Sequence, residues 1–343
     1  MEPFTHAFTS LAISQTVRTR LPRFGVLMLA VAGVAPDIDD ASYFFGPGAF
    51  FHLHRALFHS ALGGAILAGA LAYLFVEIDR RVPFTHPHKK RPAPLTFRTA
   101  LLFCAMGIVA HIVLDLFSGV GVQLLWPFWT HWYGTDLMVN LDPWMLAILV
   151  IGLMLPMLIR LVNEEVGAKK KKEGISIAAI VTFVLMAGYI GARANLRSQA
   201  VEMLVDREYH GRGPDSAQAF PTLVSPFTWR GIVNTDDTFE EIDVPVLKKE
   251  AFAADRSRTF YKPENSQEMK IAQATANAQH FSLYARAPYA TMEMHEADFR
   301  FEMRDLRFAS DDTSPENLVL RVRIDGADHI RDELFHYSTT YVP

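Results

Sequence analysis

Three short segments of the chain place histidine or aspartate within otherwise apolar stretches. Their candidate ligands are Asp37, Asp39, His54, His59, His111 and Asp115. A charged side chain inside a bilayer costs about 2.5–3.5 kcal/mol even on lenient scales, so such residues usually have a partner or a function. Imidazole and carboxylate are also the ligands that zinc and related divalent metals accept. The three segments therefore point to a metal site within a membrane.

The spacing within each segment limits how these side chains can meet. His111 and Asp115 are four residues apart, so on a helix they project from one face and can bind one ion or each other. Pro36 precedes the two aspartates and disturbs the helix there, so both carboxylates can turn toward one centre. His54 and His59 would lie about 140° apart on an ideal helix, so they converge only if His54 lies in the preceding loop.

Composition divides the chain into two parts. The 343 residues are 50% hydrophobic yet 20% charged, so the two kinds of residue must lie in different regions. Residues 1–192 hold 15 Lys and Arg against 12 Asp and Glu, whereas residues 193–343 hold 18 against 25. We therefore predict a helical membrane domain over 1–192 and an extramembrane domain over 193–343. The single cysteine, Cys104, excludes a disulfide within the chain.

Apolar stretches predict how the first domain crosses the membrane. About twenty apolar residues span a bilayer, and five segments come close to this length: 24–45, 56–78, 97–120, 143–162 and 175–192. A shorter amphipathic helix over residues 4–17 precedes them and is either re-entrant or deeply set. The predicted fold class is a mainly α polytopic membrane protein, with five spans and a short N-terminal helix, followed by a small mostly β domain.

Basic residues next to the spans predict the orientation, because Lys and Arg beside short loops stay in the cytoplasm. Three such clusters lie at residues 18–23, 80–98 and 169–172. All three can be cytoplasmic at once, which places the domain after residue 192 on the outer side of a bacterial inner membrane. Counted from the cytoplasmic ends, His6 and the ligands on the spans lie roughly 18–27 Å deep. This common depth predicts one shared polar site in the outer third of the membrane.

The C-terminal domain carries strand patterns. Alternating, β-branched and aromatic residues predict strands over 227–233, 280–287, 291–308 and 318–324, with turns at 234–237 and 325–326. They predict a small antiparallel sheet, and residues 196–209 predict an amphipathic helix that links it to the last span. Such a domain is suited to cover the membrane site, to bind a partner or to recognise envelope material.

The same segments resemble those of the YdjM-like membrane-bound metal-dependent hydrolases. PFTHAFTSLAI, GVAPDIDD, HRALFHS and HIVLDLFSGVGVQLLWPF are similar to the family's PTHxxxG, LPDID, HRGxTHS and HxxxDxxTxxGxxLLWPF. LDPW at residues 141–144 is similar to the family's IDPW. The resemblance covers about the first 160 residues. It departs at Ala56, Phe58 and Ser118, none of which replaces a candidate ligand.

The resemblance also implies which residues form the site. Carried over by position, the metal-site residues are His6, Asp37, Asp39, His54, His59, His111 and Asp115, with Arg55 as their neighbour. Seven ligands suffice for one or two divalent ions, zinc first and manganese as the alternative. Such an ion supports hydrolysis by lowering the pKa of bound water toward about 7 and by polarising an ester. Asp37 or Asp39 is then a candidate general base, and Arg55 is suited to hold a phosphate oxygen.

The depth of the site favours a lipid substrate. Four tryptophans lie at interfacial positions beside it: Trp126, Trp129, Trp132 and Trp144. We expect hydrolysis of a phosphoester or other ester of a lipid or lipid-linked envelope precursor at the outer face of the membrane. The alternative is a non-enzymatic protein, either a metal or proton transporter or an anchor that presents the C-terminal domain. Nucleic-acid binding is not expected, since the basic residues flank spans and the exported domain is acidic.

Overall fold

The computed structural model describes the chain except for residues 83–92, 167–175, 249–256, 296–297, 309–316 and 338–343. Basic residues 89–91 and 169–172, which support the predicted orientation, lie outside the described residues. The described chain forms two compact units. One comprises Met1–Asp39, Arg55–Phe128 and Tyr133–Arg193, and the other comprises Asp40–His54, Trp129–Trp132 and Ala194–Pro343.

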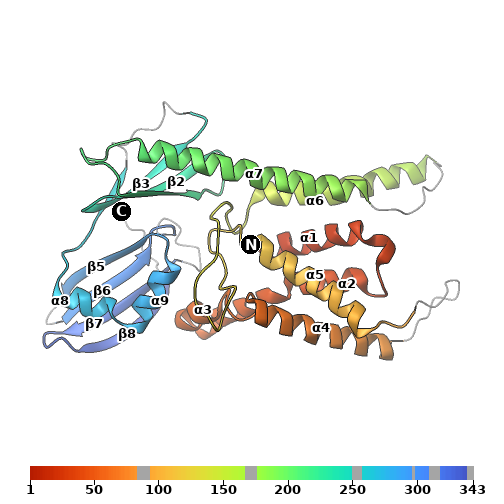
Figure 1. Ribbon diagram of the computed structural model, residues 1–343, viewed down its shortest axis with the longest axis horizontal. Helices are drawn as coiled ribbons and strands as arrows, with labels where there is room; N and C mark the ends of the chain where they lie inside the picture. Colours follow the sequence, from red (N-terminus) through yellow and green to blue (C-terminus); the bar gives the residue numbers. More distant parts are fainter. Residues whose placement is uncertain (83–92, 167–175, 249–256, 296–297, 309–316, 338–343) are drawn as a thin grey trace. The chain divides into compact units, whose positions relative to one another are not determined.

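The first unit is helical (Figure 1). Its α-helices are α1 (Pro3–Thr16), α2 (Gly25–Val34), α4 (Ala61–Arg81), α5 (Phe97–Asp115), α6 (Pro143–Glu165) and the larger part of α7 (Ile177–Val205). The short 3-10 segments η1 (Arg18–Arg20) and η2 (Ala35–Phe45) follow α1 and α2. Helices α2, α4 and α5 pack together around an apolar core that includes Leu29, Ala72 and Phe103.

Four helices among the described residues are long and apolar enough to cross a membrane: Ala61–Arg81, Phe97–Asp115, Pro143–Asn163 and Ile177–Val205. The prediction of five spans was therefore wrong, and the difference lies at residues 24–45. There α2 ends after 10 residues, or about 15 Å, and the chain continues as η2. The cause is Pro36, because its ring clashes with the preceding helical turn and it has no N–H to donate.

A glycine allows α5 to approach α2 closely. A Cβ at Gly107 would lie 2.8 Å from the carbonyl O of Leu29 and 2.9 Å from the backbone N of Gly33. His111 is one turn further along α5, and its Nδ1 lies 2.8 Å from the carbonyl O of Gly33. The close contact between these two helices therefore sets the position of His111.

Residues 116–142 form an irregular segment between α5 and α6, held in part by an isolated β-bridge between Val122 and Tyr133. The segment ends at Asp142. Its carboxylate accepts hydrogen bonds from the backbone N–H groups of Trp144, at 3.1 Å, and Met145, at 2.9 Å. The aspartate of the LDPW motif is therefore the N-cap of α6.

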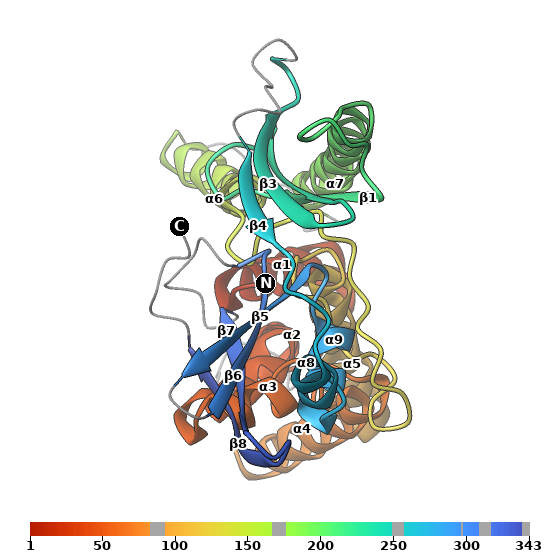
Figure 2. The same cartoon turned by 90° about the vertical axis from the view of Figure 1, so that its left-hand side faces the viewer.

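The second unit contains two four-stranded antiparallel sheets (Figure 2). The first has the order β1 (Ser216–Pro221), β2 (Thr228–Asn234), β3 (Thr238–Pro245) and β4 (Arg258–Tyr261). The second has the order β5 (Pro288–His295), β6 (Asp298–Asp305), β7 (Leu318–Asp325) and β8 (Ile330–Tyr337). The last turns of α7 share a core with the first sheet, where Leu204 and Trp229 are buried.

Three short helices accompany the second sheet. Helices α8 (Gln267–Gln273) and α9 (Ala276–Tyr284) cover one of its faces (Figure 1). Helix α3 (Pro47–Leu53) packs against β8. The mostly β character of the C-terminal region was predicted, and the structure refines a single small sheet to two.

Two of the predicted strands correspond to β2 and β7. The predicted strand over 280–287 was wrong, because α9 occupies most of it. Thr275 caps that helix by accepting a hydrogen bond from the backbone N–H of Ala278 at 3.2 Å. Ala278, Phe281 and Tyr284 are buried at helical spacing, so the helical period decides the structure there.

In two further segments the structure divides the chain into helices and strands differently from the prediction. The predicted strand over 291–308 is a pair of strands, β5 and β6, which pair antiparallel from Pro288↔Asp305 to His295↔Asp298. The predicted linker helix over 196–209 is the continuation of α7, which runs without a break to Val205.

Candidate metal centre

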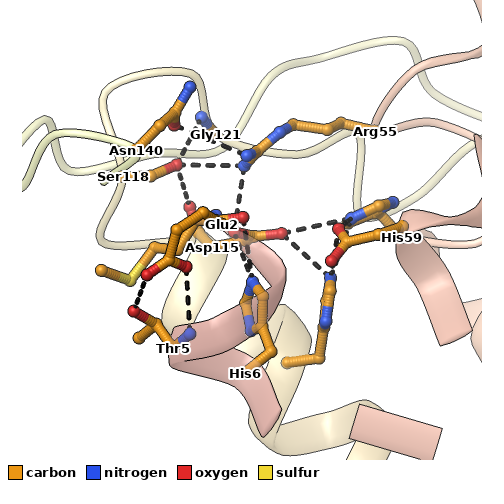
Figure 3. A network of polar contacts seen from close by, with 12 residues as sticks. Glu2, Thr5, His6, Arg55, His59, Asp115, Ser118, Gly121 and Asn140 are labelled. Carbon is orange, nitrogen blue, oxygen red and sulfur yellow. Dashed lines mark hydrogen bonds and ion pairs between the residues drawn. The ribbon is translucent and has the colours of Figure 1, made fainter. Parts of the chain in front are cut away.

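The helical unit brings together five of the seven predicted metal-site residues: His6, Asp37, His59, His111 and Asp115. His6 comes from α1 and Asp37 from η2, whereas His59 lies just before α4 and the other two lie on α5. The three histidines and Asp115 have fully buried side chains, and that of Asp37 is 9% exposed. Figure 3 shows His6 and His59 approaching Asp115 from different sides. Four separate elements therefore contribute to one polar cluster.

Four atoms of this cluster form a compact set, which we call the four-atom set: His59 Nε2, His111 Nε2, Asp115 Oδ2 and Asp37 Oδ1. The two imidazole nitrogens are 3.0 Å apart, and each lies 3.2 Å from the Asp115 oxygen. The Asp37 oxygen lies 3.4 Å from His111 Nε2 and 3.7 Å from His59 Nε2. Ligands placed 2.0–2.1 Å from a tetrahedral zinc ion are about 3.3 Å from one another. The spacing therefore suits a single small cation.

Hydrogen bonds to the other ring nitrogens determine which atoms face this set. His111 Nδ1 lies 2.8 Å from the carbonyl O of Gly33, which can only accept, so this nitrogen carries the proton. His59 Nδ1 lies 2.9 Å from Asp39 Oδ2 and donates in the same way. In the neutral rings both Nε2 atoms are then acceptors, and they face Asp115 Oδ2, which accepts no hydrogen bond among the described residues. Three buried acceptors at this distance repel unless a cation lies among them or one of the rings takes up a proton.

Two more buried atoms at the cluster support the same conclusion. Among the described residues, His6 Nδ1 and Asp37 Oδ2 have no hydrogen-bond partner. One ligand atom from each of His6, Asp37, His111 and Asp115 lies within 4.8 Å of the others. Unsatisfied buried polar atoms are costly. The donor set therefore fits a divalent metal, with neutral imidazole and carboxylate as its ligands.

The other oxygen of Asp115 lies against two cationic groups and one imidazole. Arg55 Nη1 lies 3.0 Å from Asp115 Oδ1 and also donates to Ser118 Oγ at 3.1 Å, while its Nη2 lies 3.5 Å from Asn140 Oδ1 (Figure 3). His6 Nε2 lies 3.4 Å from the same Asp115 oxygen, and the N-terminal ammonium of Met1 contacts it as well. The guanidinium thus orients Asp115 so that only Oδ2 faces the two histidines.

Asp39 lies behind His59 rather than in the four-atom set. Its Oδ2 accepts hydrogen bonds from His59 Nδ1 and from the backbone N–H of Arg55, at 2.9 and 3.2 Å. A carboxylate that holds the far nitrogen of a ligating histidine fixes its tautomer and orientation. The structure therefore gives Asp39 the geometry of a residue that positions His59.

His54 belongs to the second unit, whereas the four-atom set belongs to the first. Its Nδ1 lies 2.8 Å from Asp40 Oδ1, and its ring stacks on Phe50 with 4.3 Å between centroids. These three residues all belong to the second unit. The predicted convergence of His54 with His59 thus finds no counterpart in the helical unit.

The site also contains groups that sequence reasoning did not single out as functional. The carbonyl of Gly33 orients His111, and Ser118 and Asn140 hold the guanidinium of Arg55. Asn140 directly precedes the LDPW motif, and Ser118 directly follows HIVLDLF. Their positions next to these motifs are a weak indication that both residues belong to the site. A backbone carbonyl such as that of Gly33 gives none.

Comparison with known proteins bears on the whole helical region. The family model of the YdjM inner membrane protein matches residues 1–196, which is more than half of the chain. Neither the comparison with curated proteins nor that with solved structures returned a match. The match confirms the resemblance found in the sequence and includes every candidate ligand described above. The chain, which has four apolar helices of membrane-spanning length among its described residues, belongs to the YdjM inner membrane protein family.

Proposed function

We propose that this protein is an integral membrane metal-dependent hydrolase that cleaves a phosphoester or other ester of a lipid or lipid-linked envelope precursor. The observation that carries the proposal is the meeting of three buried acceptors, His59 Nε2, His111 Nε2 and Asp115 Oδ2, within 3.2 Å of one another. Zinc suits these ligands best, and manganese is the alternative. One ion would use the four-atom set, and a second would need His6.

Each residue of the site has a distinct part in the proposed chemistry. A divalent ion held by the four-atom set supplies Lewis acidity, which acidifies water and polarises an ester. Asp37 is the candidate general base, because its Oδ2 has no hydrogen-bond partner among the described residues. Asp39 is the other candidate, although it already holds His59 Nδ1 through a hydrogen bond of 2.9 Å. Arg55 orients Asp115, and its predicted contact with a substrate phosphate would come in addition to that task.

We infer further that the site faces the outer leaflet and that the C-terminal domain lies outside the inner membrane. The support comes from the two ends of α4. His59, a residue of the site, lies just before its first residue, whereas the basic residues Arg80 and Arg81 lie at its other end, about 30 Å away. Basic residues of this kind mark the cytoplasmic side. Trp129 and Trp144 are exposed, as interfacial residues would be, but Trp132 is buried and does not fit that prediction. A site at this level would meet lipid head groups more readily than soluble substrates.

The test combines metal quantification with a lipid phosphoesterase screen on purified protein, for the natural chain and for Asp37→Asn. The natural protein should contain one or two equivalents of zinc or manganese, and Asp37→Asn should lower turnover about 10²-fold or more. Equal turnover in the two proteins would remove Asp37 from the mechanism.

The same measurements separate the enzyme from the alternatives. An anchor should contain no stoichiometric metal, and His111→Ala with Asp115→Ala should leave its behaviour unchanged. A transporter should instead carry the metal or protons across the membrane of proteoliposomes. Either result, together with no turnover on any lipid ester, would overturn the proposed hydrolase.

A further inference from the structure

The segment Asp40–His54 belongs to the second unit, although in sequence it lies between two parts of the helical unit. Within the second unit its helix α3 packs against β8. Phe51 is the centre of this packing and is 3% exposed. Its ring centroid lies 4.5 Å from that of Phe335 on β8. The rings of Phe281 and Tyr284, on α9, lie 5.6 and 5.7 Å from it. The C-terminal domain thus holds this segment through a cluster of aromatic rings.

The residues that adjoin the two ends of this segment are Asp39 and Arg55. They are joined to each other, because Asp39 Oδ2 accepts a hydrogen bond from the backbone N–H of Arg55 at 3.2 Å. The same oxygen accepts from His59 Nδ1 at 2.9 Å. Arg55 has a φ of +56°, a left-handed conformation that a residue other than glycine keeps only where its surroundings hold it. The segment therefore begins and ends at groups that orient His59 and Asp115.

A second segment repeats this arrangement. Trp132 and the three residues before it also belong to the second unit. The Trp132 ring is buried and lies 5.0 Å from that of Tyr284. In sequence these residues lie between Ser118 and Asn140, whose side chains accept hydrogen bonds from the Arg55 guanidinium. Both segments held by the second unit are thus flanked by residues that position Arg55.

We propose that the C-terminal domain is a positioning element of the metal site, which acts through the contact between Phe51 and Phe335. By holding α3, the domain restricts both ends of the segment, so that Asp39 stays behind His59 and Arg55 stays against Asp115. This inference rests on the proposed metal site. It assigns the C-terminal domain a part in metal affinity, whereas a domain that only packs on α3 would leave the site unchanged.

The experiment measures Co²⁺ binding to the full-length protein in detergent, because the visible spectrum of bound Co²⁺ reports the geometry of its ligands. Phe335→Ala should weaken Co²⁺ binding tenfold or more and alter the spectrum, and Phe335→Leu should do both to a smaller extent. Leu334→Ala is the matched control, since Leu334 is the next residue on β8 and is 41% exposed. It should bind Co²⁺ as the natural protein does.

A folded Phe335→Ala protein with natural affinity and spectrum would overturn the inference while leaving the proposed metal site intact. A natural protein that binds no Co²⁺ would instead overturn the metal site itself. If Phe335→Ala does not fold, the test passes to Phe335→Leu and Phe51→Leu. Each should weaken Co²⁺ binding. The double variant should lose less Co²⁺ affinity than the product of the two single fold-changes predicts, because both substitutions disrupt the same contact. Natural affinity in both single variants would again count against the inference.

Discussion

The two units each bury a carboxylate completely, and the two carboxylates have opposite surroundings. Glu240, on β3 of the second unit, is fully buried. Its oxygens accept hydrogen bonds from Thr238 Oγ1 at 2.7 Å, Ser257 Oγ at 2.7 Å and Thr259 Oγ1 at 2.8 Å. Asp115, in the helical unit, is equally buried, but its Oδ2 faces the Nε2 atoms of His59 and His111, which are acceptors in the neutral rings.

The difference teaches that burial of a carboxylate does not by itself indicate a metal. Glu240 is compensated by neutral hydroxyl donors, which satisfy its lone pairs within the fold. Asp115 has the Arg55 guanidinium for one oxygen, while the other meets only further acceptors. The absence of donors at Asp115 Oδ2, among the described residues, is what suits this site to a cation from outside the chain.

The largest expected effect, on metal content, tests the contrast between Asp115 and Glu240 directly. Asp115→Asn removes the charge that holds the cation, so metal content measured on the purified protein should fall from stoichiometric to below about a tenth. Glu240→Gln is the matched variant in the other unit. It should keep its full metal content and lower the free energy of unfolding by about 1–3 kcal/mol, because one acceptor of the hydroxyl groups is lost. Equal metal loss in both variants would show that the comparison is mistaken.

A smaller effect is expected where a carboxylate acts through a neighbour. Asp39→Asn keeps the size of the side chain but weakens the hold on His59 Nδ1. Loss of such an outer partner typically lowers metal affinity by about 10–100-fold. Zinc affinity, measured by competition with a chromogenic chelator, should therefore fall in Asp39→Asn without being abolished. Complete loss of zinc would mean that Asp39 is a direct ligand.

The comparison can be sharpened through the backbone as well. Gly107→Ala places a methyl group against the carbonyl of Leu29, so α5 must move from α2 and carry His111 with it. Overpacking of this kind costs about 1–3 kcal/mol, and zinc affinity should fall along with the thermal midpoint. The control is Gly69→Ala on α4, where an added Cβ has no neighbour within 4 Å. Unchanged zinc affinity in Gly107→Ala would separate the helix contact from the site.

The smallest expected effect lies in the second unit and depends on pH. Burial, together with the nearby imidazole of His52 on α3, lowers the pKa of His280 on α9. The unfolded chain therefore takes up this proton first, and stability should fall as the pH drops below about 6.5. The thermal midpoint of metal-free protein should decrease between pH 7.5 and 5.5, by less in His280→Gln than in the natural chain. An equal decrease in both would exclude His280 as the cause.

Much of the candidate site could be predicted because charged or strongly polar side chains within apolar, membrane-length segments cost free energy and are therefore rare without a function. Polar residues within apolar segments drew attention to Asp37, His59, His111 and Asp115, and the i, i+4 spacing of the last two predicted their common face. The roles of Asp39 and His54 could not be separated in this way. Asp39 follows Asp37 by two residues, and His54 begins the HRALFHS motif that contains His59. Spacing along the sequence does not say which group each side chain will contact in the folded protein.

By itself, then, the sequence determined the two-part character of the chain, its membrane helices after Pro36 and the set of candidate ligands, because hydropathy and helical spacing are local properties. Only the tertiary structure decided how closely α5 approaches α2, and that His59 and His111 turn the same nitrogen toward Asp115. These outcomes depend on contacts between distant segments, such as Gly107 against α2 and the Gly33 carbonyl against His111. Which ring nitrogen of a histidine donates and which one accepts is determined only when such distant segments pack against each other.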